Sequence, residues 1–215
     1  MTGKVDLTEI RRSYESQSMA SKDLADNPVD QFSRWLQQAR EAEVLDATAM
    51  NLATVDTAGQ PSSRIVLLKH FDEQGFCWYT DSRSRKGQDL AQNPRAALLF
   101  HWRDFSRQVR IQGKVEKLSA EEADQYFHSR PEGSRFSAAS SHQSTEVASR
   151  GVLVQTVSAL QAQYPAGDVP RPDAWIGYLL KPDYFEFWQG LENRLHDRIV
   201  YSPVESAWQK KRLSP

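Results

Sequence analysis

The chain contains little cysteine and no long apolar segment, and both shortages narrow what it can be. Only one of its 215 residues is a cysteine, which excludes an intrachain disulfide and gives no metal-ligand spacing. No apolar run is long enough to span a bilayer, and the first residues, MTGKVDLTEIRRSYE, lack the apolar core of a secretion signal. These absences predict a cytoplasmic protein without a membrane partner.

The chain also has no excess of positive or negative charge. Lysine and arginine number 27 against 28 aspartate and glutamate, giving a net charge of -1. A chain this close to neutrality has no bulk attraction for nucleic acid or for an anionic membrane. We therefore expect no nucleic-acid partner.

The usual catalytic motifs are absent as well. The sequence has no G-x-G-x-x-G after a strand, no P-loop, no G-x-S-x-G and no H-E-x-x-H. The five histidines share no metal-ligand spacing, so we expect no metal site. A dinucleotide-binding parallel sheet and a metal-dependent hydrolase are both disfavoured.

The composition and pattern favour one globular domain rich in strands. Residues 1–26 are polar and read as a flexible N-terminal arm, and residues 27–215 as a single domain. About eight strands with short links, and helices that do not alternate with them one for one, predict an α+β protein that is mainly β. The predicted architecture is an antiparallel sheet closed into a barrel with helices around it.

Several elements can be placed by their end signals. Residues 62–72 read as one strand, and the apolar run at 65–68 predicts that both faces of it are buried. A helix is expected to begin after Ser82 or Ser84, and another after Ser119. Residues 132–146 are small and polar and predict a loop, whereas residues 150–164 predict a helix.

Two places suggest an anion. Arg85 and Lys86 fall in the first turn of a predicted helix, where the helix dipole disfavours cations and an anion such as phosphate would relieve them. Tyr126 and Arg130 lie one helical turn apart and could grip a phosphate together. The alternative at both places is an ordinary set of surface side chains.

The segment at 194–198, RLHDR, is the most concentrated basic stretch near the C-terminus. On a strand over residues 195–201, Arg194, His196 and Arg198 would share one face, with Leu195 and Asp197 on the other. A planar anionic ligand would relieve the repulsion between these groups. A solvated edge strand explains the pattern equally well.

The available side chains bind flat phosphorylated molecules but include no obvious nucleophile. Such a site is typical of a chain that borrows its chemistry from a cofactor.

Seven short segments, in order along the chain, carry a family resemblance. They are RIVLLK at 64–69, YT at 79–80, SRK at 84–86, RQVRIQG at 107–113, YFHSRP at 126–131, HQS at 142–144 and FWQGLENRLHDR at 187–198. Together the sequence resembles the pyridoxine/pyridoxamine 5′-phosphate oxidase family, FMN enzymes with a split β-barrel. The RLHDR element is the most specific, and the likeness runs from about Arg11 to Pro215.

The resemblance implies roles for individual residues. In the family's pattern, Arg194 and His196 lie over the substrate ring as the catalytic pair, and Arg11 and Tyr14 form part of a lid that also touches substrate. The substrate phosphate would sit among Lys69, Tyr126, Arg130 and Ser134. FMN would be held by Arg64, Ile65, Val66, Leu67, Leu68, Lys69, Tyr79, Thr80, Arg85, Lys86, Gln108, Gln143, Ser144, Trp188 and Arg198, of which Gln143, Ser144, Trp188 and Arg198 would come from the second subunit of a homodimer.

The implied activity is oxidation of pyridoxine 5′-phosphate and pyridoxamine 5′-phosphate to pyridoxal 5′-phosphate, with hydride transfer to FMN and O2 as the final acceptor, giving hydrogen peroxide. Two other functions stay open. One is a non-catalytic carrier of FMN or pyridoxal phosphate, which would not need both Arg194 and His196. The other is a different flavin reductase, which would not need the Tyr126, Arg130 and Ser134 grip.

Overall fold

The computed structural model describes residues 6–9, 13, 14, 16, 18–205 and 207–215. The chain folds into two compact units. The first unit comprises residues 1–47, 99–111 and 184–215, and the second comprises residues 48–98 and 112–183. No helix within the described ranges is both long enough and apolar enough to cross a membrane.

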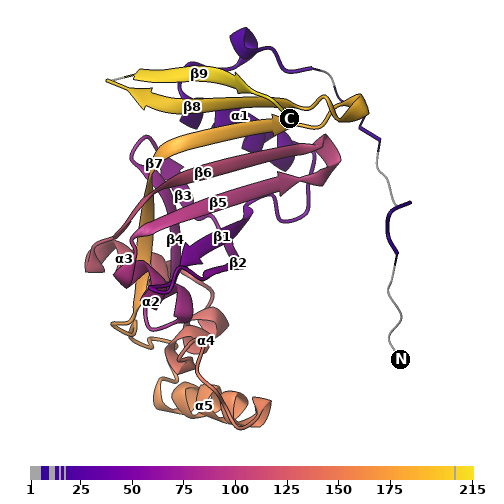
Figure 1. The fold of residues 1–215 in the computed structure, drawn as a ribbon. Helices are drawn as coiled ribbons and strands as arrows, with labels where there is room; N and C mark the ends of the chain where they lie inside the picture. Colours follow the sequence, from indigo (N-terminus) through magenta and orange to yellow (C-terminus); the bar gives the residue numbers. More distant parts are fainter. Residues whose placement is uncertain (1–5, 10–12, 15, 17, 206) are drawn as a thin grey trace. The chain divides into compact units, whose positions relative to one another are not determined.

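One sheet contains the nine strands found among the described residues (Figure 1). Its order is β2-β1-β5-β6-β7-β4-β3, and β8 pairs with both β7 and β9. The ladders β1–β2, β3–β4, β4–β7, β7–β8 and β8–β9 are all antiparallel, as the sequence predicts. The strands are β1 (Ala49–Val55), β2 (Pro61–Leu67), β3 (His70–Asp72), β4 (Gly75–Asp81), β5 (Arg95–Trp102), β6 (Arg107–Lys117), β7 (Trp175–Gln189), β8 (Asp197–Val204) and β9 (Ala207–Leu213).

The helices begin at the capping signals that the sequence offers. Asn27 caps α1 by accepting a hydrogen bond from the backbone N–H of Val29, and Ser84 caps α2. Ser119 and Glu122 form a complete capping box at α3. The helices are α1 (Pro28–Glu41), α2 (Arg85–Gln92), α3 (Ala120–Ser129), α4 (Glu132–Ser140) and α5 (Arg150–Gln163), with short 3-10 turns η1 (Ser21–Asp23), η2 (Arg103–Phe105) and η3 (Glu192–Arg194).

The predicted loop at 132–146 is wrong over its first part, which forms α4. Phe136 explains the difference, because its side chain is fully buried against Phe127, Val169 and Trp175. Burial of one large aromatic ring offsets the weak helix preference of the surrounding serines. The helix predicted over 150–164 is confirmed as α5.

The prediction for residues 62–72 also needs correction. The strand breaks after Leu67, and Leu68 and Lys69 separate β2 from β3. The run at 65–68 is not buried on both faces, since Ile65 is 65% exposed and Leu67 is 42% exposed. Ile65 and Leu67 alternate along β2 and therefore share one face, which is the exposed one, while Val66 points to the other face.

Each unit contains its own aromatic core. In the first unit, Phe32 packs edge-on against Phe100 with ring centroids 4.8 Å apart, and Trp35 packs edge-on against Phe187 at 5.2 Å. In the second unit, the cluster around Phe127 and Phe136 joins α3, α4 and β7. This second cluster supports the wall of a polar cavity in the same unit.

Candidate functional site

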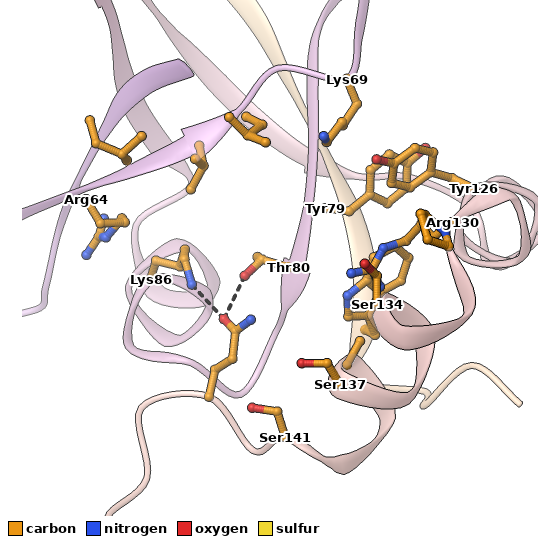
Figure 2. A pocket seen from close by; sticks show the side chains of 17 residues that line it. Arg64, Lys69, Tyr79, Thr80, Lys86, Tyr126, Arg130, Ser134, Ser137 and Ser141 are labelled. Atoms are coloured by element: carbon orange, nitrogen blue, oxygen red, sulfur yellow. Dashed lines mark hydrogen bonds between the residues drawn. The ribbon is translucent and has the colours of Figure 1, made fainter. Parts of the chain in front are cut away.

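A cavity of about 620 Å³ opens in the second unit (Figure 2). Strands β2 and β4 and helices α2, α3 and α4 contribute most of its walls. Most of the lining residues are polar or charged. The predicted site residues that line it are Arg64, Ile65, Val66, Leu67, Lys69, Tyr79, Thr80, Lys86, Tyr126, Arg130, Ser134 and Gln143.

Two cations stand on one side of the cavity (Figure 2). The Arg64 guanidinium donates to the backbone carbonyl of Leu52 at 3.1 Å and to the Thr54 and Ser62 hydroxyls at 2.8 and 2.6 Å. These bonds connect the guanidinium to both β1 and β2 and fix its orientation. The guanidinium thus bonds to neutral groups, and the same two hydroxyls donate to the Asp89 carboxylate behind them at 2.6 and 3.2 Å.

Lys86 is the second cation on this side. Its Nζ donates to Gln143 Oε1 at 2.9 Å, and Thr80 Oγ1 donates to the same oxygen at 2.9 Å. Burial, together with the positive charge of Arg64, lowers the pKa of Lys86 to about 8. An anion between Arg64 and Lys86 would raise this pKa and offset both effects, so this side is suited to a phosphate.

The opposite side of the cavity is built on stacked aromatic rings (Figure 2). Tyr79 stacks on Tyr126 with centroids 4.1 Å apart and on Trp175 at 5.3 Å. The Arg130 guanidinium lies over the Trp175 ring, with Cζ 4.9 Å from its centroid. Ser134 from α4 completes this side.

Arg130 is the most informative residue of this second side. Its Nη1 is buried and has no hydrogen-bond partner among the described residues. Burial also lowers the pKa of Arg130. A buried guanidinium nitrogen without an acceptor is costly, and a ligand anion would satisfy it. The cavity thus contains two candidate anion-binding sites, one at Arg64 and Lys86 and one at Arg130. We call them the two anion grips.

The basic pair of α2 divides between two hollows. Lys86 faces the cavity, whereas Arg85 lines a neighbouring hollow and pairs with Asp56 at 3.3 Å. The Ser144 hydroxyl accepts a hydrogen bond from the Arg85 backbone N–H at 3.2 Å. Because consecutive helical residues point about 100° apart, the two cations cannot share one face. Gln143 lines both hollows.

Gln143 and Ser144 contact residues of their own chain. The resemblance assigns both to the site of a second subunit, which stays a prediction, and within this chain they contact Thr80, Lys86 and Arg85 on the α2 side. Leu68 is 5% exposed and does not line the cavity, and Arg11 lies outside the described residues.

The remaining predicted residues belong to the first unit, where the RLHDR segment is not the continuous strand that the alternation predicts. Asn193 and Arg194 both have positive φ, at 53° and 61°, and η3 precedes a strand that begins only at Asp197. A strand over 195–201 is therefore wrong at its start. Strand alternation cannot place Arg194 and His196 on one face with Arg198.

His196 is held by the backbone and by aromatic rings. Its Nδ1 accepts a hydrogen bond from the Leu191 N–H at 3.0 Å, and its ring lies 4.7 Å from Trp188 and 5.3 Å from Tyr14, centroid to centroid. Partial burial and the nearby charge of Arg194 lower the pKa of His196. The neutral ring must therefore carry its proton on Nε2.

Arg198 is fixed by a buried carboxylate. Its Nε and Nη2 donate to Glu186 at 2.8 and 3.2 Å, and Nη1 donates to the Ser214 carbonyl at 2.9 Å. Glu186 also accepts from Arg110. Burial alone would raise the pKa of Glu186, but the hydrogen bond from Arg198 and the charge of Arg110 lower it overall. Gln108 lies on β6 in the same unit.

Sequence reasoning missed five lining residues, which are Pro131, Ser137, Ala138, Ser141 and Trp175. Trp175 is the first residue of β7 and packs against Arg130. In the sequence, a single tryptophan at the start of a strand cannot be told apart from an ordinary core residue. The two serines lie on and just after α4, where the sequence predicts a loop. A helical prediction there would have placed residues 134, 137 and 141 on one face.

Comparison with known proteins matches two family profiles to the chain. Residues 36–164 match the profile described as pyridoxamine 5′-phosphate oxidase. Residues 175–215 match the profile described as the pyridoxine 5′-phosphate oxidase C-terminal dimerisation region. Together the two profiles span both units.

Full-length relatives agree with these profiles. The pyridoxine/pyridoxamine 5′-phosphate oxidase of Janthinobacterium sp. (strain Marseille) is 51% identical over 212 residues, covering 98% of this chain and all of the relative. The protein of the same name from Cytophaga hutchinsonii is 51% identical over 214 residues, covering 99% of this chain and all of the relative.

A solved structure shows the same fold. The crystal structure of PhzG from Burkholderia lata 383 in complex with tetrahydrophenazine-1-carboxylic acid superposes with a TM-score of 0.88 and 31% identity, covering 95% of this chain and all of that one. The expected mainly β, antiparallel split-barrel fold with surrounding helices is confirmed.

Proposed function

Because the chain belongs to the pyridoxamine 5′-phosphate oxidase family, we propose that it oxidises pyridoxine 5′-phosphate and pyridoxamine 5′-phosphate to pyridoxal 5′-phosphate. The proposed cofactor is FMN and the proposed electron acceptor is O2, which would leave as hydrogen peroxide. The two anion grips of the cavity carry the proposal, because both the cofactor and the substrate bear a phosphate.

The residues present fit FMN on the α2 side. Arg64 and Lys86 supply positive charge, and Thr80 and Gln143 supply neutral hydrogen-bonding groups. FMN, when bound, supplies the acceptor for a hydride. Arg85 and Ser144, which meet at the start of α2, are further proposed contacts. Gln108, which belongs to the first unit, stays a proposed FMN contact through the resemblance alone.

The substrate phosphate fits the opposite side. Arg130 has a buried donor without a partner among the described residues, and the Ser134 and Tyr126 hydroxyls line the same wall. Lys69 adds a charge to the same cavity. Contacts to this phosphate would supply binding energy that positions the reacting carbon, although that carbon is not itself bound by these residues.

His196 and Arg194 are the proposed catalytic pair. The Leu191 N–H occupies His196 Nδ1, so Nε2 would donate to a substituent of the substrate ring. Arg194 is exposed and charged and would stabilise negative charge on the substrate. In this arrangement His196 holds its proton rather than removing one.

A homodimer is the proposed assembly. The match of residues 175–215 to a dimerisation region supports it. Trp188 and Arg198 would then reach the FMN of the second copy. Sedimentation of the flavin-loaded protein tests this, and a monomer that keeps one FMN per chain would contradict it.

The activity is tested by turnover in air with pyridoxine 5′-phosphate, following pyridoxal 5′-phosphate and peroxide together. Equal amounts of both products are expected. Pyridoxine without its phosphate is the matched control, and its kcat/KM should be lower by at least about a hundredfold because the Arg130 side stays empty. Equal use of both substrates would contradict the assignment of the phosphate grip.

A further inference from the structure

We propose that Asp197 is a positioning residue for the substrate site, because its carboxylate anchors the N-terminal segment and thereby holds the Tyr14 ring against His196. The inference rests on the proposed function, which places His196 at the substrate. Asp197 lies between His196 and Arg198 in the sequence, yet neither the proposed cofactor grip nor the proposed substrate grip includes it.

The Asp197 carboxylate joins three segments of the first unit. It is only 5% exposed, and its Oδ2 accepts hydrogen bonds from Ser18 Oγ at 3.0 Å and from the Met19 N–H at 2.5 Å. Its Oδ1 accepts from Arg212 on β9, and Arg212 also donates to the Met19 carbonyl at 2.8 Å. The Met19 backbone is therefore held at both its N–H and its C=O.

Tyr14 precedes this anchor in the sequence and packs against the segment that carries His196. Its ring meets His196 and Trp188 edge-on, with centroids 5.3 and 5.8 Å away. Gly190 is shaped to receive it, since a Cβ there would lie 2.5 Å from Tyr14 Cδ1. Among the described residues, the segment thus meets the proposed catalytic histidine through an aromatic contact and β8 through a charged anchor.

The anchored backbone lies close in sequence to the aromatic contact, since Tyr14 is five residues before Met19. Without the Asp197 carboxylate, Ser18 Oγ and the Met19 N–H lose their acceptor, although Arg212 can still donate to the Met19 carbonyl. The segment is then held less firmly at Met19, and the Tyr14 ring meets His196 in a smaller fraction of the molecules.

A kinetic cycle tests this link. Asp197→Asn keeps the size of the side chain but replaces one acceptor oxygen with an amide donor among three donors, so the anchor is weakened. KM for pyridoxine 5′-phosphate should rise about threefold, as expected for the loss of roughly one hydrogen bond, with a much smaller change in kcat. In a Tyr14→Ala background, Asp197→Asn should add nothing further to KM. Multiplying effects would overturn the proposal, because Asp197 would then act independently of Tyr14.

Two further variants separate positioning from general stability. Asp26→Asn is the matched control, since Asp26 also pairs the N-terminal segment with β9, through Lys210 at 2.9 Å, but is fully exposed. It should leave KM unchanged. If Asp197→Asn fails to fold, Ser18→Ala removes a single bond to the same carboxylate, and its smaller rise in KM should also vanish in the Tyr14→Ala background.

Trypsin cleavage after Lys22 gives a readout that needs no activity. Lys22 is exposed and lies between Met19 and Leu24. Cleavage should be faster in Asp197→Asn than in wild type, Tyr14→Ala or Asp26→Asn. Equal rates would overturn the anchor. Faster cleavage in a protein whose wild type does not oxidise the substrate would sink the proposed function and leave the anchor standing.

Discussion

The Nδ1 atom of His196 accepts a hydrogen bond from the backbone N–H of Leu191 at 3.0 Å. This bond determines which tautomer the neutral imidazole adopts, and it opposes protonation because a second proton would have to enter at Nδ1. Burial, and secondly the charge of Arg194, lower the pKa of His196, so they also oppose protonation of the ring. The ring is thus prepared to donate from Nε2.

The first prediction concerns the pH dependence of His196. The neutral ring, and with it the Leu191 bond, is present above the lowered pKa and is lost as the pH falls through it. We expect kcat/KM for pyridoxine 5′-phosphate to have an acid limb below the ordinary histidine value of 6.5. His196→Gln should lose this limb, and an unchanged limb in that variant would assign it to another group.

His196→Ala should reduce kcat/KM by about tenfold, the worth of one hydrogen bond to a neutral group. His196→Gln should retain more activity, because its amide N–H can replace the Nε2 donor. A loss of about a thousandfold in either variant would instead indicate that His196 transfers a proton.

The next prediction concerns the Arg130 side of the cavity. Arg130→Ala should raise KM for pyridoxine 5′-phosphate by about 10- to 150-fold, since it removes a charged donor to the phosphate. The Kd for FMN should stay unchanged, because Arg64 and Lys86 are untouched. Isothermal titration with FMN and steady-state kinetics separate the two effects, and a matching loss of FMN affinity would contradict the division into two grips.

Lys86 makes a prediction on the opposite side. Its pKa of about 8 means that the charge is mostly present at pH 7 and mostly absent at pH 9. The Kd for FMN binding to the cofactor-free protein should therefore rise about tenfold across that interval. Lys86→Arg keeps its charge at pH 9 and should show a flat profile. A wild-type profile that is equally flat would remove Lys86 from the phosphate grip.

A stability prediction separates two glycines of the second unit. A Cβ at Gly113 would lie 2.0 Å from the backbone oxygen of Lys181, so Gly113→Ala should lower the free energy of unfolding by about 2 to 4 kcal/mol. Gly133 in α4 has open space around its Cβ position, and Gly133→Ala should raise it by about 0.5 to 1 kcal/mol. Urea denaturation of both variants checks the pair, and equal effects would contradict the close β6–β7 approach at Gly113.

The sequence predicts best where local chemistry decides the structure. The caps at Ser84 and Ser119 start helices where expected, because a side-chain acceptor satisfies free N–H groups within three residues. The anion grips also follow from residue type. Lys86 and Arg130 are predicted from their charge and their helical positions alone, and both line the cavity.

The remaining features depend on contacts that a linear pattern does not contain. Strand alternation groups Arg194 with His196, but the left-handed backbone at Asn193 and Arg194 delays β8 until Asp197. The helix α4 depends on the burial of Phe136 among residues from α3 and β7. The anchor at Asp197 joins positions 178 residues apart, which no local signal reveals.

The most direct test of the account is a single mixing experiment without oxygen. The protein is loaded with FMN, mixed with one equivalent of pyridoxine 5′-phosphate per site, and followed by the visible absorbance of the flavin. The account predicts that the absorbance bleaches fully and that one pyridoxal 5′-phosphate forms per FMN. A flavin absorbance that stays constant, with substrate shown to be bound by equilibrium dialysis, would contradict the oxidase and indicate a carrier.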